Sequence, residues 1–456
     1  MSGLFESLST ATSALTAARL GLDVTGQNLA NVNTVGYSRR TLILADQPPG
    51  DALSPGRGVS VVAVQAMRDA FVNTRLRTEI TGGAYDAAVL DGMTEVEAAV
   101  GLPGESLDVE ITAFFDAFAT LAQDPTSISA REAVIGQGTS LSAAFRTMTE
   151  RFTAARRNAD ASIASSADEI NQLAAEVAAL NTQIVSRGFD VESLRDRRDV
   201  AISRLSELGG VTATTNAEGG VDLAIGSGRP LVVSGTAYAL TTATSGPLGL
   251  TSLSIGGYDI TGEIAGGRIG GLLAVRDTLV PGYQTSLDQM AYDFASAINT
   301  AHQAGFDATG SPGGAFFTPL AGAAGSAAAI DVDATLAADS ALVAASGTGS
   351  IGDNAAARAI AALRDARIAN GNTATAVGAW GQIAFRVGSD VRGAQASNDT
   401  HDAVTRQLQR LRDQTSGVSV DEEAANLMRF QRSYEASARY FTTIVDTLDT
   451  LMNMVR

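Results

Sequence analysis

Two apolar seams, one at each end of the chain, constrain its fold more than any other feature of the sequence. Each seam is a row of apolar or small side chains that recurs at spacings of three and four residues. The N-terminal seam consists of Leu4, Leu8, Ala11, Leu15, Ala18, Leu22, Thr25 and Leu29. The C-terminal seam consists of Leu427, Phe430, Tyr434, Ala438, Phe441, Val445, Leu448, Met452 and Val455. A period of 3.5 residues keeps a stripe facing a partner helix, so both ends are predicted to form coiled-coil helices.

These terminal helices are predicted to need helical partners. A lone amphipathic helix of about thirty residues is marginal in water. Each exposed Leu or Phe also forgoes roughly 1.5 to 3 kcal/mol of burial free energy. The two seams therefore point to assembly, and we predict that their large side chains form the assembly interface. These are Leu4, Leu8, Leu15, Leu22 and Leu29 in the first helix, and Leu427, Phe430, Tyr434, Phe441, Leu448 and Met452 in the last.

Composition excludes several classes of function. The chain has 456 residues with 45% hydrophobic content, which suffices for two or three domains with real cores. It has no cysteine, so a disulfide framework, a thiolate nucleophile and a cysteine metal site are all excluded. Its two histidines, His302 and His401, are expected to be ordinary surface or satisfied helix residues. A net charge of −17 argues against a nucleic-acid partner, because phosphate binding needs clustered cations.

The sequence predicts neither a membrane span nor a cleaved secretion signal. No run approaches eighteen consecutive apolar residues. The first thirty residues carry Arg19 as their only cation, without a central apolar block or a small-residue cleavage site. No membrane partner is therefore expected.

Helices are predicted for most of the chain. The first should run from Gly3 to Ala30, and a β-hairpin should follow within residues 37–66. The amphipathic pattern then predicts helices over 68–100 and 107–121. From Leu141 to Ile184 the seam is unbroken, which predicts a single helix from near Ser127 to Ser186, roughly 90 Å long.

The second half of the chain alternates between β-rich and helical patterns. Gly, Thr and Ser dominate residues 209–267, which read as a β-rich domain, whereas residues 305–352 are either a second part of it or a surface excursion. Further helices are predicted over 269–302, 354–363 and 374–414, and a capping box at Ser419–Glu422 opens the last helix.

The predicted fold class is mainly α, with terminal helices pairing as a coiled coil, a long-helix bundle and an inserted β-rich outer domain. Three domains follow from this order. They are a terminal coiled-coil domain of residues 1–36 plus 419–456, a helical rod domain of residues 37–208 plus 268–304 plus 353–418 with the hairpin at 37–66, and a β-rich outer domain of residues 209–267, with residues 305–352 as a candidate addition.

One glycine motif resembles a cofactor site. Residues Gly347–Gly352 match the dinucleotide fingerprint and precede a predicted helix. No second hydrophobic strand follows, although the fingerprint needs a βαβ unit. A chance match is the better explanation in a chain with 47 glycines. Walker, nucleophile-elbow and zinc-helix motifs are missing, so the chain is predicted not to be an enzyme and to have no catalytic, cofactor or metal residues.

Three segments resemble a known family. Gly26–Arg39, with the sequence GQNLANVNTVGYSR, is similar to the signature that bacterial flagellar rod, hook and hook-associated proteins share after their first helix. Val420–Arg439 resembles the closing helix of the hook-associated members. Gly270–Asp277, with the sequence GGLLAVRD, and the long helices before it are also similar to those members.

The resemblance implies a location and a set of partners. In that family the terminal helices pair into an inner domain, and the β-rich part faces outward. It implies a structural subunit at the junction of hook and filament, outside the cell, exported by the flagellar type III channel without a cleaved signal. It also implies self-association into a ring layer between the hook protein and a second, filament-side hook-associated protein, and it makes the C-terminal helix a candidate site for an export chaperone.

The resemblance also assigns a bend to Asn31, Asn33, Gly36 and Tyr37, which would join the inner helix to the helical domain. Gly36 could supply a positive φ there, and Tyr37 a large apolar anchor. A plain turn that ends the helix is the simpler reading. Two other functions stay open: a hook or rod subunit of the same family and, remotely, a dinucleotide-binding enzyme built on Gly347–Gly352.

Overall fold

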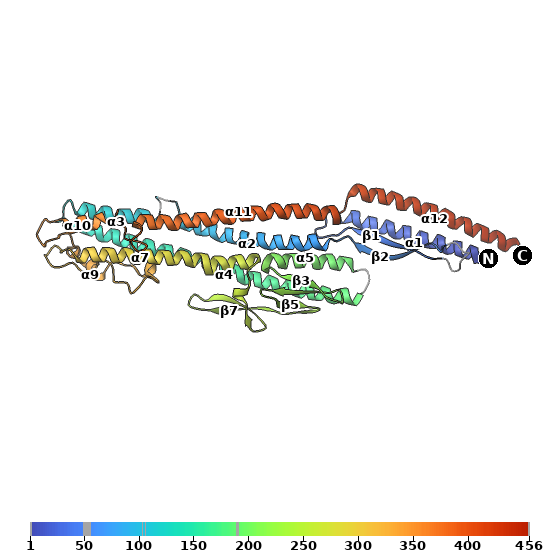
Figure 1. The fold of residues 1–456 in the computed structure, drawn as a ribbon, viewed down its shortest axis with the longest axis horizontal. Helices are drawn as coiled ribbons and strands as arrows, with labels where there is room; N and C mark the ends of the chain where they lie inside the picture. Colours follow the sequence, from blue (N-terminus) through green and yellow to red (C-terminus); the bar gives the residue numbers. More distant parts are fainter. Residues whose placement is uncertain (1, 49–55, 103, 105, 188–190, 455–456) are drawn as a thin grey trace. The chain divides into compact units, whose positions relative to one another are not determined.

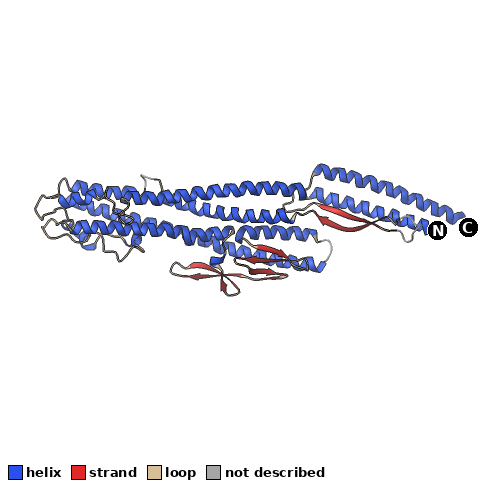
Figure 2. Ribbon diagram, viewed as in Figure 1, coloured by secondary structure: helices blue, strands red, loops and turns tan. Residues whose placement is uncertain are grey.

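The computed structural model describes residues 2–48, 56–102, 104, 106–187 and 191–454. Its contacts divide the chain into two compact units. Unit 1 comprises Met1–Thr81, Glu169–Leu240 and His401–Arg456, and unit 2 comprises Gly82–Asp168 and Thr241–Thr400. The fold is mainly helical, as predicted, and its strands form separate small groups (Figure 2). Within the described residues, no helix combines the length and the apolarity that a membrane span requires.

Unit 1 begins with the predicted N-terminal helix, α1 (Ser2–Ala30). The helix ends in turns, in which the amide of Asn31 donates to the carbonyl oxygens of Gln27 and Asn28. Gly36 has a φ of +82°, a conformation that glycine adopts without steric cost. The predicted helix end and the positive φ of Gly36 are therefore confirmed.

The predicted hairpin is present. Strands β1 (Arg40–Asp46) and β2 (Val59–Ala66) pair antiparallel, with a register shift between Ile43 and Leu44. Residues 49–55, between the two strands in the sequence, lie outside the described part of the chain.

The last helix, α12 (Val420–Met454), lies beside α1, and the two ends of the chain lie together (Figure 1). The hydroxyl of Ser419 accepts from the amide of Glu422 at 3.5 Å, as in the first half of a capping box. The carboxylate of Glu422 lies instead on Arg39, 2.7 Å from its guanidinium. Val455, the last predicted seam position, is outside the described residues.

A four-stranded antiparallel sheet completes unit 1, together with α5 (Glu192–Gly209) and the C-terminal part of α4. The sheet has the order β3-β4-β5-β6, with bounds Thr212–Thr215, Val221–Ile225, Arg229–Val233 and Thr236–Ala237. The alternate residues Val221, Leu223 and Ile225 are buried. The side chain of Asn181 in α4 binds the sheet. Its nitrogen donates to the carbonyl oxygen of Val221 at 2.8 Å, and its oxygen accepts from the backbone amide of Val221 at 3.0 Å.

Long helices form most of unit 2, and three of them continue into unit 1. These three are α2 (Ala70–Val100), α4 (Ile128–Arg187) and α11 (Ala376–Ser416). The 60-residue α4 confirms the predicted single helix. The other helices of unit 2 are α3 (Leu107–Leu121), α6 (Gly267–Ala274), the π-helical turn Val275–Leu279, α7 (Val280–Gln303) and α10 (Ala355–Ala362).

Aromatic rings fill the core at one end of this helical bundle. Phe114 of α3 contacts Phe294 of α7 with ring centroids 5.5 Å apart, and Phe316 and Phe317 close the cluster at 4.9 Å from each other. Edge-on packing of such rings adds about 0.5 to 1.5 kcal/mol per pair to the burial term. Because Phe316 and Phe317 are fully buried, residues 305–352 are packed into the bundle at these positions and are not only a surface excursion.

The remaining strands and short helices of unit 2 are small. Strands β7 (Leu240–Ser245), β8 (Leu250–Ile255) and β9 (Tyr258–Asp259) form a three-stranded sheet, and a 3-10 turn follows at Thr261–Glu263. The segment 305–352 contains α8 (Ser326–Ala329), α9 (Ala334–Ala338), the 3-10 turn Ser340–Leu342 and isolated β-bridges. The boundary between the two units falls at the start of β7, within the predicted β-rich domain, and the three-domain division stays a prediction.

Candidate assembly site

The two terminal helices pack antiparallel. Gly21 of α1 lies against the ring of Phe430 in α12, so closely that a Cβ on Gly21 would come within 2.5 Å of the ring. Nearer the end of α1, the side-chain amide of Asn28 donates to the carboxylate of Glu423 at 3.1 Å. Residues further along α1 thus meet residues further back along α12, and both seams face the same contact.

Contact between α1 and α12 covers the predicted seams only in part. The small residues Ala11, Ala18 and Thr25 are buried. Most of the large predicted positions are half-buried, namely Leu4, Leu8, Leu15, Leu22, Leu427, Phe430, Phe441 and Leu448. Leu29, Tyr434 and Met452 are exposed, and Met452 keeps 71% of its surface in contact with solvent. The pair therefore leaves apolar area uncovered.

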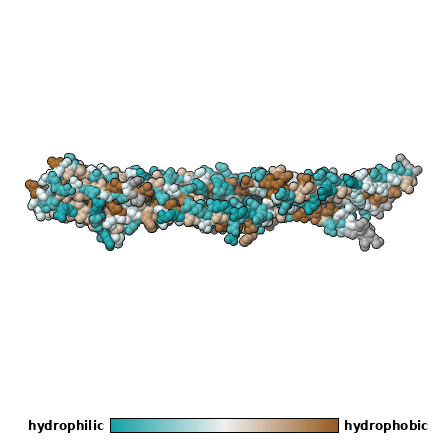
Figure 3. Space-filling model, turned by 90° about the horizontal axis from the view of Figure 1, so that it is seen from above, coloured by the Kyte–Doolittle hydropathy of each residue, from teal (hydrophilic) through white to brown (hydrophobic). Residues whose placement is uncertain are grey.

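Further apolar side chains of the pair are exposed. Phe5 in α1 is 60% exposed, and Met428, Tyr440, Leu451 and Met454 of α12 are exposed as well. The face drawn in Figure 3 shows hydrophobic residues in several groups among hydrophilic ones. Apolar side chains that the contact between the two helices leaves exposed can bind a further partner.

Two residues of the contact between α1 and α12 are not among the predicted seam residues. Ile444 is the most buried apolar residue of α12, at 5% exposure, whereas the predicted position beside it, Val445, is half-buried. At this point of α12 the buried position is therefore one residue before the predicted seam position. Gly21 was missed because a glycine carries no side chain to join an apolar pattern, and its role follows only from the ring that it admits.

The four predicted bend residues lie in different surroundings. Asn31 donates from its side-chain amide to the carbonyl oxygen of Gln27 at 2.9 Å, which closes the end of α1. Asn33 is exposed. A Cβ on Gly36 would come within 2.2 Å of Val200 in α5, so the backbone approaches that helix closely. Tyr37 donates from its hydroxyl to Asn28 at 2.8 Å.

Asn28 is the centre of the bend. Its side-chain oxygen accepts from Tyr37 and from the amide of Arg40 at 2.9 Å. Its side-chain nitrogen donates to the carbonyl oxygen of Arg40 at 2.9 Å and to Glu423. One buried amide thereby joins α1, the start of β1 and the start of α12.

Arg39 binds the start of α12 next to the bend. Its guanidinium lies 2.8 Å from the carboxylate of Glu423, which is 2% exposed, and 2.7 Å from that of Glu422. A buried carboxylate needs such compensation, because an unpaired charge there would cost several kcal/mol. The backbone amide of Arg39 also donates to the carbonyl oxygen of Ser416 at 2.8 Å, at the end of α11.

A second ion-pair cluster holds the segment between β2 and α2 to α5. The guanidinium of Arg68 lies 2.6 Å from Glu192, 2.7 Å from Asp196 and 3.5 Å from Asp199. Burial alone would lower the pKa of Arg68, but the hydrogen bond and charge of Asp196, with the charge of Glu192, raise it. The pKa of the Tyr37 phenol is raised, chiefly by burial. Arg68 thus stays a cation and Tyr37 a hydrogen-bond donor.

The predicted bend residues do not include the three polar side chains that hold the bend in place. Asn28, Arg39 and Glu423 all lie within the segments that carry the family resemblance. A signal was available, because Asn28 follows Thr25 by three residues on the buried side of the seam, where a polar side chain needs a partner. Which partner it has could not be read, since Glu423 is 395 residues away.

Comparison with known proteins identifies the family. Residues 8–37 match the model of the flagella basal body rod protein. Residues 93–317 match the helical domain of the flagellar hook-associated protein FlgK, and residues 412–454 match the C-terminal model of the flagellar basal body rod proteins FlgEFG. Flagellar hook-associated protein 1 of Escherichia coli (strain K12) is 26% identical over 98% of this chain and 99% of its own length. The Bacillus subtilis (strain 168) protein of that name is 27% identical over 99% of both chains.

The chain belongs to the flagellar hook-associated protein 1 family. This family is a structural component of the bacterial flagellum and not a known enzyme family. Its kinship with the rod and hook proteins makes it a self-assembling component. The structure of the flagellar hook junction protein FlgK from Burkholderia pseudomallei has a similar fold, with a TM-score of 0.68 over 75% of this chain and 100% of its own. At 16% identity that likeness shows the fold alone.

The glycine motif has a structural role in this family member. The carboxylate of Asp353 accepts from the amides of Gly347 at 2.8 Å and Thr348 at 2.9 Å. A dinucleotide phosphate would need free amides of this kind. Hydrogen bonds, first that from the amide of Ala355 and then those from the Thr348 and Ser346 side chains, lower the pKa of Asp353. The loop thus binds its own carboxylate, which argues against the dinucleotide reading.

His302 is a satisfied helix residue, as expected. It is fully buried in unit 2, its Nδ1 lies 2.8 Å from the carbonyl oxygen of Gly314, and its Nε2 accepts from the amide of Ala344 at 2.8 Å. His401 lies 2.9 Å from the carboxylate of Glu79. In the described part of the chain, His, Asp and Glu side chains do not gather in groups of three that could hold a metal ion.

Proposed function

We propose that this chain forms the layer that joins hook to filament, the role that the resemblance of its segments to the flagellar hook-associated proteins implies. It would reach that place unfolded through the flagellar type III channel, and it would lie outside the cell. The hook protein would be its neighbour on one side and a second, filament-side hook-associated protein on the other. An export chaperone would bind the C-terminal helix.

The observation that carries this proposal is the incompletely covered pair of α1 and α12. A helix pair that keeps Phe5 and Met452 in solvent has apolar area left for neighbouring subunits. We infer that the exposed and half-buried seam residues, with the bend at Asn31–Tyr37, are the assembly interface. The terminal pair would be the inner domain, the long helices the rod domain, and the β-rich part the outer domain.

Labelling of cells tests the location. A short epitope inserted after Glu218, an exposed turn residue between β3 and β4, leaves both terminal helices unchanged. Immunogold microscopy is expected to give one narrow band between hook and filament. Label confined to the cytosol of cells with intact flagella would contradict the proposal.

The second candidate is a hook or rod subunit, which the rod-protein models at both ends of the chain favour. Label along the whole hook or rod in the same experiment would support it. Continuous label and a single band cannot both occur, so the measurement separates the two functions.

Introducing a charge into the seams tests the interface. Leu15→Asp and Phe441→Asp each place a charge where a neighbour would desolvate it. Both variants are expected to abolish incorporation of the chain into flagella, measured by immunoblot of sheared flagella. Incorporation at the level of the unaltered chain would show that the terminal seams do not carry assembly.

A further inference from the structure

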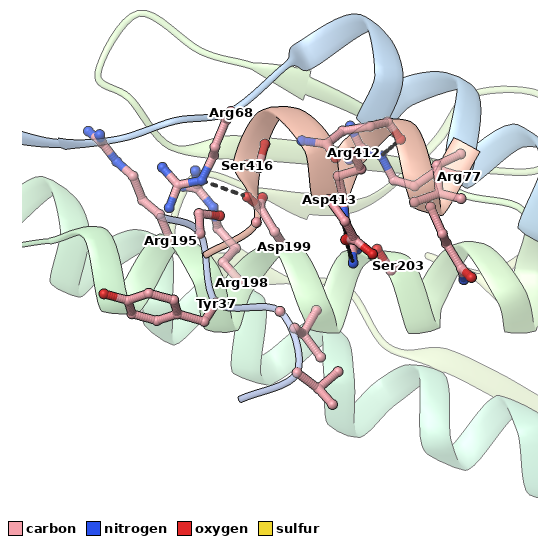
Figure 4. Close-up of a pocket in the computed structure, with 18 of the residues that line it drawn as sticks. Tyr37, Arg68, Arg77, Arg195, Arg198, Asp199, Ser203, Arg412, Asp413 and Ser416 are labelled. Carbon is pink, nitrogen blue, oxygen red and sulfur yellow. Dashed lines mark hydrogen bonds and ion pairs between the residues drawn. The ribbon is translucent and has the colours of Figure 1, made fainter. Parts of the chain in front are cut away.

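A cavity of about 370 Å³ lies in unit 1 behind the bend. Its walls come from the bend itself, the first turns of α2, the middle of α5 and the last turns of α11. Figure 4 shows the labelled side chains around the end of α11. Gly36 and Tyr37, both predicted assembly residues, belong to its lining. The cavity is therefore continuous with the proposed interface.

Arginine dominates the charged residues of the lining. Five arginines and two aspartates contribute to the walls, in a chain whose net charge is −17. Both aspartates are already engaged, because Asp199 lies 3.5 Å from Arg68 and Asp413 lies 3.0 Å from Arg412. Carboxylates outside the lining compensate two of the arginines, because Arg68 also pairs with Glu192 and Asp196, and Arg195 lies 2.7 Å from Glu192. The uncompensated positive charge of the cavity therefore lies on the two remaining arginines.

Two of these arginines lack an acidic partner. Arg77 donates to the carbonyl oxygen of Asn73 at 3.3 Å, and Arg198 donates to the side-chain oxygen of Asn181 at 3.0 Å. Within the described residues, no carboxylate forms an ion pair with either guanidinium. Burial lowers the pKa of both arginines, with the charge of Asp199 acting in the opposite direction. Each is a partly desolvated cation that an added carboxylate would stabilise.

Unpartnered polar atoms accompany this charge. Arg198 is 94% buried, since 6% of its surface is exposed, and its Nε has no hydrogen-bond partner. Ser416 is equally buried, and its Oγ also has none. Buried donors without partners are rare, because each costs about 1 to 3 kcal/mol. The same walls include the aliphatic side chains of Leu76, Ile80 and Val200.

We propose that this cavity receives an acidic side chain, flanked by an apolar one, from a second copy of this chain. The inference rests on the proposed function, because it names one contact by which neighbouring copies would join. An acidic segment suits a cationic cavity, and a chain with 49 acidic and 32 basic residues offers many such segments. The aliphatic walls fit the apolar neighbour of the carboxylate.

Photocrosslinking in assembled flagella tests the contact. Gln409 lines the cavity and is exposed, so p-benzoylphenylalanine at this position places a probe at its mouth. Irradiation of intact flagella is expected to give a crosslinked dimer of this chain. Peptide mapping is expected to locate the crosslink beside an aspartate or glutamate next to an aliphatic residue. Crosslinks to other proteins only, or to a segment without an acid, would overturn the inference.

A charge variant with a matched control sharpens the test. Arg77→Gln in the probe-bearing chain is expected to lower the dimer yield about tenfold, because a charge-assisted hydrogen bond is lost. Arg75→Gln makes the same change at an exposed position of the same helix and is expected to leave the yield unchanged. In the purified chain, Arg77→Gln is expected to keep or raise the melting temperature. A lower melting temperature would mean that Arg77 serves the fold, and would overturn the inference.

Two further outcomes distinguish a failure of the cavity inference from a failure of the proposed function. If the Glu218 epitope labels no flagellum, the proposed function fails. If the epitope labels flagella normally while Gln409 gives no dimer, the cavity inference fails alone. A dissolved anion as the occupant would give no dimer, and inorganic phosphate would raise the melting temperature of the purified chain at constant ionic strength.

Discussion

At the scale of single residues, stability in this chain depends on buried polar groups that have specific partners. Asn28 makes four hydrogen bonds to three segments of the chain. His302 is held between a carbonyl oxygen and an amide. In both cases the cost of leaving a buried polar group unpaired makes the surrounding geometry specific.

Replacement of Asn28 tests the centre of the bend. Asn28→Leu keeps the size of the side chain and removes the donor to Glu423 and the acceptor for Tyr37. We expect the free energy of unfolding to fall by roughly 2 to 4 kcal/mol, because buried partners lose their hydrogen bonds. Urea denaturation of the purified chain measures this. Asn33→Ala, at the exposed bend position, should change it by less than about 0.5 kcal/mol, and equal effects would refute the role of Asn28.

His302 predicts a pH dependence of stability. Its pKa is lowered, chiefly by burial. The unfolded chain therefore binds a proton more readily, so the stability that His302 contributes is complete above its ordinary pKa of about 6.5 and is lost as the pH falls below it. Between pH 7.5 and 5.5, urea denaturation should show a larger loss for the unaltered chain than for His302→Gln. The difference can reach about 1.4 kcal/mol per pH unit, and identical losses would contradict it.

At the scale of elements, close approach of the helices explains which small residues occur where. Gly21 admits the ring of Phe430, whereas Gly26, five residues later in α1, has open space beside it. The same residue type thus has a packing role at one position of the helix and none at the other.

Two alanine substitutions separate these roles. Gly26→Ala should stabilise the chain by roughly 0.5 to 1 kcal/mol, because alanine favours the helix. Gly21→Ala should destabilise it by roughly 1 to 3 kcal/mol, because the added Cβ meets the Phe430 ring. Thermal unfolding followed by circular dichroism measures both. Stabilisation by both changes would mean that α1 and α12 do not pack at Gly21.

At the scale of the whole molecule, the chain leaves unit 1 and returns to it twice. The two termini and the β3–β6 sheet belong to unit 1, and the aromatic core around Phe114 belongs to unit 2. Each unit has its own buried side chains, so a change in the terminal seam should act on unit 1.

Hydrogen exchange can test this division. Phe441→Asp should speed amide exchange in α1 and α12 by at least about tenfold, because it weakens the contact that protects them. Amides of α3 and α7 in unit 2 should exchange at unchanged rates. Faster exchange throughout both units would show that the terminal pair supports the entire fold.

The sequence by itself determined the helices, the hairpin and the family. Periodicity over long segments reveals which face of a helix is apolar, and so α1, α4 and α12 were predicted close to their observed bounds. Glycine at position 36 likewise made a positive φ available, and the structure has it. These features depend on residues that are near one another in the chain.

Only the tertiary structure decided which residues meet across long separations. It brought Glu423 to Asn28, placed Phe430 on Gly21, and gathered five arginines around one cavity. A buried carboxylate or an unpaired guanidinium has no signature in the sequence, because its partner can come from any segment that folding brings near. The apolar seams could be predicted from the sequence, whereas the polar contacts that fix the bend between them arise from packing.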